Sequence, residues 1–139
     1  MKTYETEIEI DAPIDVVWHA LTVQMPQTPE PFGILRIEGE IAYNARIKLW
    51  SEIVPNRAFS LKVETLDGPS KMVWRGGMPL GLFTGTRTFT LTSNSGATRF
   101  HMCEIFTGPM SNMITKSMPD LTPSFVKFAQ ALKLKAETQ

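Results

Sequence analysis

The sequence is poor in the side chains that most often carry covalent and metal chemistry. It contains one cysteine, Cys103, and two histidines, His19 and His101. A single cysteine excludes an internal disulfide, and His101 with Cys103 supplies two ligands where a closed zinc site needs four. We therefore expect no metal site, and we interpret Cys103 as a small buried side chain in a reducing compartment.

The sequence also lacks an excess of charge of either sign and a long apolar run. Fourteen Lys and Arg balance fourteen Asp and Glu, unlike the basic field of proteins that hold nucleic-acid phosphates. No segment reaches the roughly 20 apolar residues that cross a bilayer, and the N-terminus alternates acids with apolar residues, unlike a signal peptide. We expect a cytoplasmic protein without nucleic-acid partner or membrane insertion.

Sequence motifs of the common catalytic and nucleotide-binding classes are missing as well. The chain contains no G-x-S-x-G, no phosphate-binding loop and no G-x-G-x-x-G. We therefore expect no tightly held cofactor and assign no catalytic residue, apart from one weak candidate, Glu104. Whether the protein is an enzyme stays open, and binding is favoured.

What is present is typical of one globular domain. Of the 139 residues, 42% are hydrophobic and 20% are charged, which is ordinary globular composition at the commonest domain size. No linker, repeat or low-complexity tract divides the chain. Residues 1–139 are therefore predicted to form a single domain.

The N-terminal third predicts a strand followed by short helices. Residues 3–10 alternate between acidic and mostly apolar side chains, which indicates a strand with one wet face. Asp11 and Pro13 are suited to a helix start, and an apolar stripe predicts a helix over about residues 13–22. Three prolines before Gly33 then favour a loop or a brief second helix.

The middle of the chain is typical of an antiparallel meander, because short strand-like segments alternate with turn residues. Six strands are predicted, at residues 34–40, 45–53, 58–66, 70–76, 82–92 and 97–107. The turns between them are expected at Tyr43-Asn44, Pro55-Asn56, Asp67-Gly68-Pro69, Gly77 to Gly81 and Ser93 to Gly96. After Gly108 the apolar period changes to three and four, which predicts an amphipathic helix over about residues 120–136.

This order predicts an α+β fold. A curved antiparallel sheet of about seven strands wraps around the long C-terminal helix, because only that helix is long enough to cover one sheet face. A strongly curved sheet and a straight helix do not meet everywhere, so a cavity is expected near one end.

Two local sequences, A-P-x-x-x-V-W-x-x-L at Ala12 to Leu21 and F-x-x-F-A-x-A-L at Phe125 to Leu132, resemble the START-like superfamily, also called SRPBCC or Bet v 1-like. Two more, the run from Trp74 to Leu91 and T-R-F-H-M-C-E-I-F-T-G at Thr98 to Gly108, are similar to its bacterial polyketide-cyclase-like branch. The resemblance covers almost the whole chain. It implies a helix-grip fold with a deep cavity for lipids, hormones, polyketides or other hydrophobic molecules.

The same resemblance leaves the function open, because members include carriers, enzymes and modules that activate the chaperone Hsp90. The branch commonly has a histidine where this chain has Arg87, so a role of that imidazole does not transfer. We expect binding of a small hydrophobic molecule. The alternatives are a cofactor-independent cyclase, dehydratase or hydrolase in the same pocket, and an Hsp90-activator-like interaction module.

Arg87 and Glu104 are the candidate polar groups of the pocket. Each stands in the middle of an otherwise apolar strand face, and a four-residue loop at Ser93 to Gly96 makes them diagonal neighbours. A buried charge needs a partner, so we expect an ion pair, either purely structural or orienting a ligand. The predicted ligand-binding set is Arg87, Glu104, Trp74, Phe89, Phe100, Met102, Phe106, Phe83, Met113, Met118, Leu121 and Phe125.

Two further features bear on partners and access to the pocket. Met113 and Met118 lie before the last helix, where flexible apolar side chains suit either a pocket entrance or ordinary core filling. Trp50 falls on the opposite sheet face from Ile47 and Leu49 and is a candidate contact in a homodimer.

Overall fold

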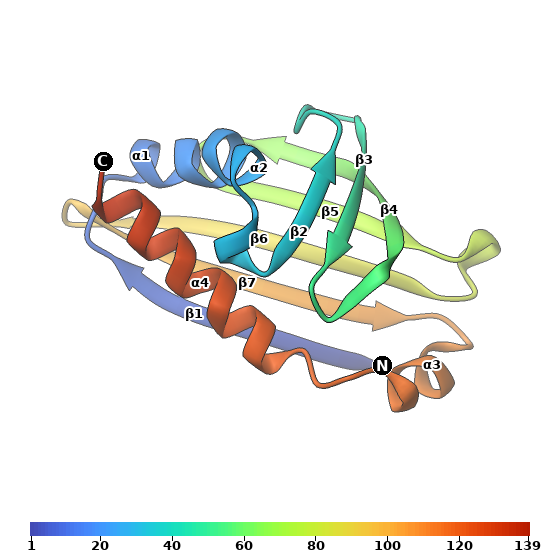
Figure 1. Ribbon diagram of the computed structural model, residues 1–139. Helices are drawn as coiled ribbons and strands as arrows, with labels where there is room; N and C mark the ends of the chain where they lie inside the picture. The colour runs from blue at the N-terminus through green and yellow to red at the C-terminus, as the bar shows by residue number, and fades with distance from the viewer.

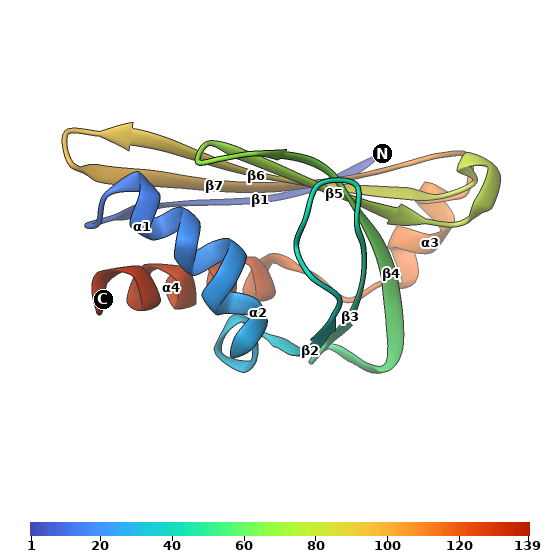
Figure 2. The ribbon, with the colours of Figure 1, turned by 90° about the horizontal axis from the view of Figure 1, so that it is seen from above.

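The protein is one curved, seven-stranded antiparallel sheet with its helices on one side. This computed structural model describes residues 1–139, and the strand order is β1-β7-β6-β5-β4-β3-β2. Figure 2 shows β1, β5, β6 and β7 nearly edge-on, with α1, α2 and α4 on one side and β2 to β4 curling toward them. The strands are β1 (Lys2–Ile10), β2 (Ile34–Glu38), β3 (Arg46–Ser51), β4 (Val54–Asp67), β5 (Lys71–Gly77), β6 (Thr84–Asn94) and β7 (Ala97–Thr107).

The predicted α+β architecture with about seven strands is confirmed, and β1 is one residue longer than expected. The helical segment after β1 is longer than the predicted 13–22. It consists of α1 (Ile14–His19), a π-helical turn η1 (Ala20–Gln24) and α2 (Met25–Gln27), followed by a 3-10 turn η2 (Glu30–Phe32). The helical backbone continues from η1 into α2 without a break, so Pro26 does not end the helix.

The predicted turn at Pro55-Asn56 is wrong. Ser51 pairs with Val54, so the chain reverses at Glu52 and Ile53, and Pro55 lies inside β4. The register shifts after this pair, and the next partners are Trp50 and Ala58. Pro55 is therefore in an unpaired bulge, where a proline removes no ladder hydrogen bond.

The hairpin between β6 and β7 is tighter than predicted. Asn94 pairs with Ala97, so the loop is the two residues Ser95 and Gly96 rather than Ser93 to Gly96. Both loop residues have positive φ, 52° and 88°, as in the two-residue turns that match strand twist. The register moves by two residues relative to the prediction, and a shift of two leaves every side chain on its predicted face.

Two helices close the chain. α3 (Ser111–Ser117) is a short helix that the sequence did not predict, and α4 (Thr122–Glu137) agrees with the predicted 120–136 within two residues. Figure 1 shows α4 lying across the sheet in front of β1 and β7, while α3 lies at the opposite end of the sheet from the C-terminus. No helix of the protein is long and apolar enough to span a bilayer.

The core lies between the concave sheet face and α4. Phe128 of α4 is 2% exposed and packs against Phe32, Phe89 and Phe100, with ring centroids 5.2, 5.9 and 6.1 Å away. Trp74 meets Phe89 edge-on at 4.7 Å. Aromatic side chains therefore fill the space under the middle of α4.

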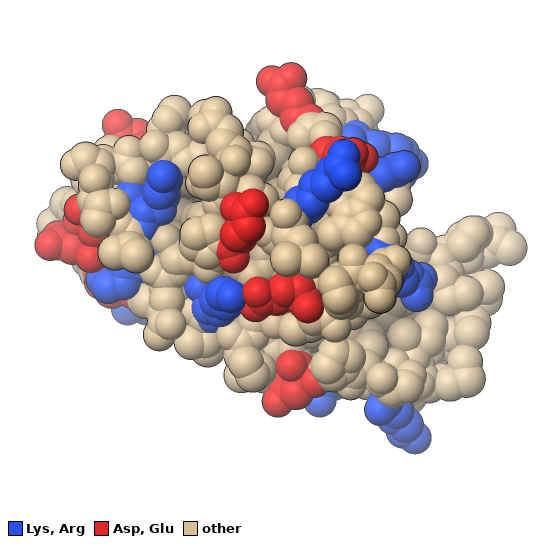
Figure 3. Space-filling model, viewed as in Figure 1, with Lys and Arg blue, Asp and Glu red and all other residues tan.

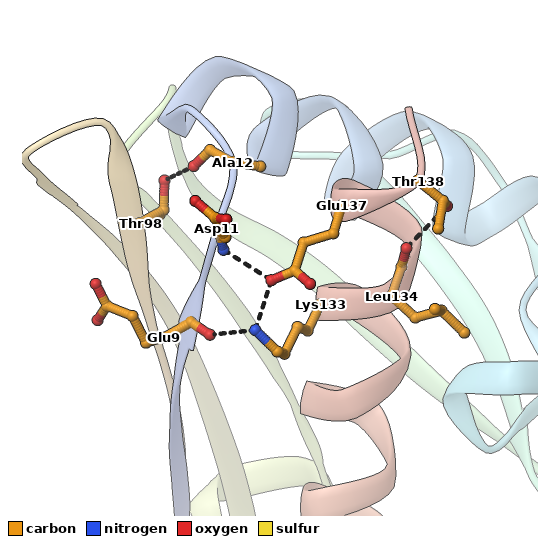
Figure 4. A network of polar contacts seen from close by, with 8 residues as sticks. All are labelled: Glu9, Asp11, Ala12, Thr98, Lys133, Leu134, Glu137 and Thr138. Carbon is orange, nitrogen blue, oxygen red and sulfur yellow. Dashed lines mark hydrogen bonds and ion pairs between the residues drawn. The ribbon is translucent and has the colours of Figure 1, made fainter.

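Polar contacts hold the C-terminal end of α4 against the end of β1 (Figure 4). Lys133 Nζ donates to the carbonyl of Glu9 at 3.0 Å and to the Glu137 carboxylate, while the Asp11 N–H donates to Glu137 Oε2 at 2.8 Å. The hydrogen bond from Lys133, followed by that from the Asp11 N–H, lowers the pKa of Glu137 below its ordinary value of 4.5. These contacts hold the C-terminal end of α4 in place.

The Glu137 contacts are expected to weaken in acid. Because the folded pKa is lowered, the contribution to stability is present above about pH 4.5 and is lost as the pH falls through the folded pKa. Melting curves of the wild type and Glu137→Gln should therefore differ at about pH 6 and converge near pH 3. Glu40→Gln, at an exposed carboxylate without an ion pair, is the control, and an equal difference at both pH values would contradict this account.

Candidate functional site

Arg87 and Glu104 lie directly opposite each other on β6 and β7, closer than the diagonal arrangement expected. Arg87 Nε and Nη2 both donate to Glu104 Oε1, at 3.0 and 2.6 Å. The side chains are 22% and 13% exposed. The predicted ion pair is present, and it is partly open to solvent rather than sealed in the core.

The pair belongs to a row of residues that crosses the concave face. Trp74 of β5 pairs with Arg87, and Tyr4 of β1 pairs with Glu104. From α4, the Phe125 ring lies 4.8 Å from Arg87 Cζ, a cation–π contact. Three elements besides β6 and β7 therefore surround the pair, and its position depends on α4 docking on the sheet.

Two polar atoms beside the pair have no partner in the protein. Both Arg87 donors bond to Oε1, and no hydrogen bond reaches Glu104 Oε2. A Cβ on Gly85 would lie 3.1 Å from that oxygen, so the glycine provides the space it occupies. The buried indole Nε1 of Trp74 also has no acceptor. A buried indole N–H without an acceptor is uncommon in folded proteins, whereas Glu104 Oε2 is not among the buried atoms.

The structure brings most of the predicted ligand-binding set to this concave face, but to different depths. Trp74, Phe89, Phe100 and Met102 are fully buried core residues. Phe106, Leu121 and Phe125 are buried in the same core, and the half-buried Phe83 and Met118 pack against it. Met113, on α3, is 61% exposed and does not join the group. The apolar surface that a ligand can reach without unfolding the core is therefore limited to the part around Phe83 and Met118.

A surface hollow that the sequence did not predict lies next to this region. It has a volume of about 560 Å³ and is lined by residues 2–4 of β1 and by side chains between Thr115 and Thr122. Tyr4 lines it and also packs against Phe106 and Phe125, at ring distances of 6.3 and 6.1 Å. Of the predicted set, only Met118 lines the hollow, because its walls come from opposite ends of the chain.

Two other residues singled out from the sequence lie on the outer sheet face. Cys103 is half-buried rather than buried as predicted. Burial raises the pKa of its thiol, with a further contribution from the carboxylates of Glu5 and Glu104. A raised pKa disfavours the nucleophilic thiolate, in keeping with an inert cysteine. Trp50 is half-buried under the guanidinium of Arg36, 5.2 Å from the ring.

Comparisons with known proteins identify the fold. No protein-family model matches the chain, and no curated protein matches its sequence. Solved structures match closely in shape: protein MLL2253 from Mesorhizobium loti has a TM-score of 0.75 at 16% identity, covering 99% of this chain and 98% of its own. At this identity the likeness establishes the fold.

Two other solved structures with the same shape have names that refer to a biosynthetic locus or an enzyme. DynU16, from the dynemicin biosynthetic locus, has a TM-score of 0.72 at 18% identity, and the match covers 99% of this chain and 48% of that one. Truncated norcoclaurine synthase from Thalictrum flavum has a TM-score of 0.68 at 15% identity, with 95% and 91% covered. The helix-grip fold that the START-like resemblance implied is confirmed.

Proposed function

We propose that the protein binds a small hydrophobic molecule on the concave face, between β5 to β7 and the N-terminal half of α4. The observation that carries the proposal is the Arg87–Glu104 pair, which is partly exposed within an otherwise apolar face. A ligand site needs few polar groups in an apolar surrounding to fix orientation. The pair provides them beside the rings of Tyr4 and Phe125.

The free oxygen of the pair indicates the chemistry of the ligand. Glu104 Oε2, which receives no hydrogen bond from the protein, is the acceptor for a ligand hydroxyl. Beside it, the rings of Phe83 and Phe106 stack in parallel, 5.4 Å apart. We therefore propose a planar aromatic or polyketide-like molecule that carries a hydroxyl.

The hollow at the start of β1 is the proposed entrance. Its volume is about 560 Å³ and its lining is mostly polar, unlike the apolar lining of a ligand pocket itself, so it is proposed as the entrance only. Tyr4 and Met118 line it, Tyr4 pairs with Glu104 in the sheet, and methionine is a flexible side chain. Rotation of these two side chains is the smallest movement that connects the hollow with the concave face.

Native mass spectrometry of the purified protein tests the proposal. The wild type is expected to retain a bound small molecule, and the double variant Arg87→Met/Glu104→Met to lose it while keeping its fold by circular dichroism. Arg99→Met/Glu7→Met, which removes an exposed ion pair on the outer face, is the matched control and should retain the molecule. Equal retention in all three proteins would show that Arg87 and Glu104 do not contribute to binding.

A cofactor-independent enzyme in the same pocket is the second candidate, and the free Oε2 of Glu104 is the observation that favours it. A carboxylate oxygen without a hydrogen-bond partner is available as a general base. Glu104→Gln should then keep ligand binding and abolish turnover, whereas a carrier would show no turnover in either form.

Cellular location and assembly belong to the proposal as well. We propose the cytoplasm as the location, and a homodimer through the Trp50 face is kept as a prediction that size-exclusion chromatography with light scattering will test. The Hsp90-activator-like alternative stays a prediction from the resemblance alone.

A further inference from the structure

Three cations stand in one row on the outer face of the sheet, opposite the proposed ligand site. Arg46 of β3 pairs with Lys62 of β4, which pairs in turn with Arg75 of β5. Their chain neighbours Ile47, Val63 and Trp74 are buried on the concave face, so the three cations point outward. Neighbouring strands are about 4.8 Å apart, which places three positive side chains within reach of one small ligand.

The row has too little negative charge to balance it. Arg75 Nε lies 3.0 Å from Glu64, and these side chains are 52% and 38% exposed. Arg46 and Lys62 form no ion pair. Like charges directly opposite each other on neighbouring strands lower the stability of a sheet, and a bound anion would offset that loss.

A hollow in the surface accompanies the row. Its volume is about 220 Å³, and its lining includes all three cations, the glycines 76 and 77, and Thr84 of β6. Gly77 has a φ of 150°, and a Cβ there would lie 2.0 Å from the carbonyl oxygen of Phe83. Only glycine permits this close approach of β5 to β6. Residue 77 therefore contributes no side chain to the hollow.

Size and charge together indicate the ligand. The hollow is smaller than the roughly 300 Å³ at which drug-sized ligand pockets begin. Three cations and one carboxylate leave a formal charge of +2, which a monocarboxylate does not neutralise but a phosphate monoester, at about −1.5 to −2 near neutral pH, does. Guanidinium groups suit the oxygens of phosphate, and the Thr84 hydroxyl is a further donor.

We propose that this hollow binds a dianionic phosphate group, either free or carried by a small molecule or a lipid headgroup. Figure 3, which views the molecule from the side of α4, shows blue and red side chains together over the region of β3 and β4 in Figure 1. The site is on the opposite sheet face from Arg87 and Glu104, so this proposal does not depend on the proposed function.

Titration of the 15N-labelled protein with potassium phosphate, against potassium chloride at equal ionic strength, tests the site. Phosphate should give saturable shifts at the amides of residues 75–78 and 84, and Lys62→Met should weaken its apparent affinity about tenfold. Lys71→Met removes an exposed cation on the same strand and face as Arg75 and should change the affinity less than about twofold. Arg46→Gln, at an exposed position, replaces Lys62→Met if that variant does not fold.

Shifts that match those of chloride, or equal weakening by Lys62→Met and Lys71→Met, would overturn the proposal. Co-sedimentation with phosphatidate vesicles, compared with phosphatidylcholine vesicles, distinguishes the two sources of phosphate. Loss of phosphatidate binding in Lys62→Met assigns a lipid headgroup. Binding of inorganic phosphate without vesicle binding assigns a small soluble phosphate.

Discussion

Replacing Arg87 with methionine is expected to destabilise the protein by about 3 kcal/mol, because the change leaves the carboxylate of Glu104 largely buried and without its cation. Glu104→Met should cost a similar amount for the converse reason. The double variant should cost about 1 kcal/mol, because no uncompensated charge remains in the apolar face. Urea unfolding of the wild type and the three variants measures the free energies.

The coupling between the two sites is the quantity that decides this prediction. Arg99 and Glu7 form a matched pair on the outer face, 3.3 Å apart and about half exposed, for which a double-mutant cycle should give less than about 1 kcal/mol. Small, additive effects at Arg87 and Glu104 as well would mean that water screens the pair. The concave face would then have no polar group held in place for a ligand.

Phe128→Ala is expected to have the largest effect on stability, about 4 kcal/mol. The side chain is 2% exposed and packs against aromatic rings from η2, β6 and β7, so alanine leaves a cavity that rigid neighbours do not fill. Val126→Ala, two residues earlier and 41% exposed, should cost less than about 0.5 kcal/mol. If both variants unfold at similar urea concentrations, α4 does not pack on the sheet as described.

Periodicity predicted most of the fold, because burial on one face leaves a direct trace in the sequence. The alternation in the segments of β6 and β7 placed Arg87 and Glu104 on the concave face. That assignment survived an incorrect hairpin loop because the register moved by two residues. Single residues predicted turns less reliably, because contacts with other strands also determine where the chain turns. Pro55 indicated a turn but lies in a bulge of β4. The helix α3 was missed because its seven residues are too few to show a clear apolar stripe.

The site could be predicted only in part, because its remaining features depend on contacts between distant segments. The hollow beside Tyr4 joins residues 2–4 to residues 115–122. The row of Arg46, Lys62 and Arg75 requires the register of three strands. The alternation of each cation with apolar neighbours places it on the outer sheet face. It does not indicate that the three cations lie opposite one another.

A titration of the 15N-labelled protein with 2-naphthol, a planar aromatic alcohol, tests the central claim most directly. We expect saturable shifts at the amides of Gly85, Glu104 and Phe106, and an affinity about tenfold weaker in Arg87→Met/Glu104→Met because the hydroxyl loses its acceptor. Shifts confined to the outer face of the sheet, or an affinity that the double variant does not change, would contradict a ligand site organised by Arg87 and Glu104.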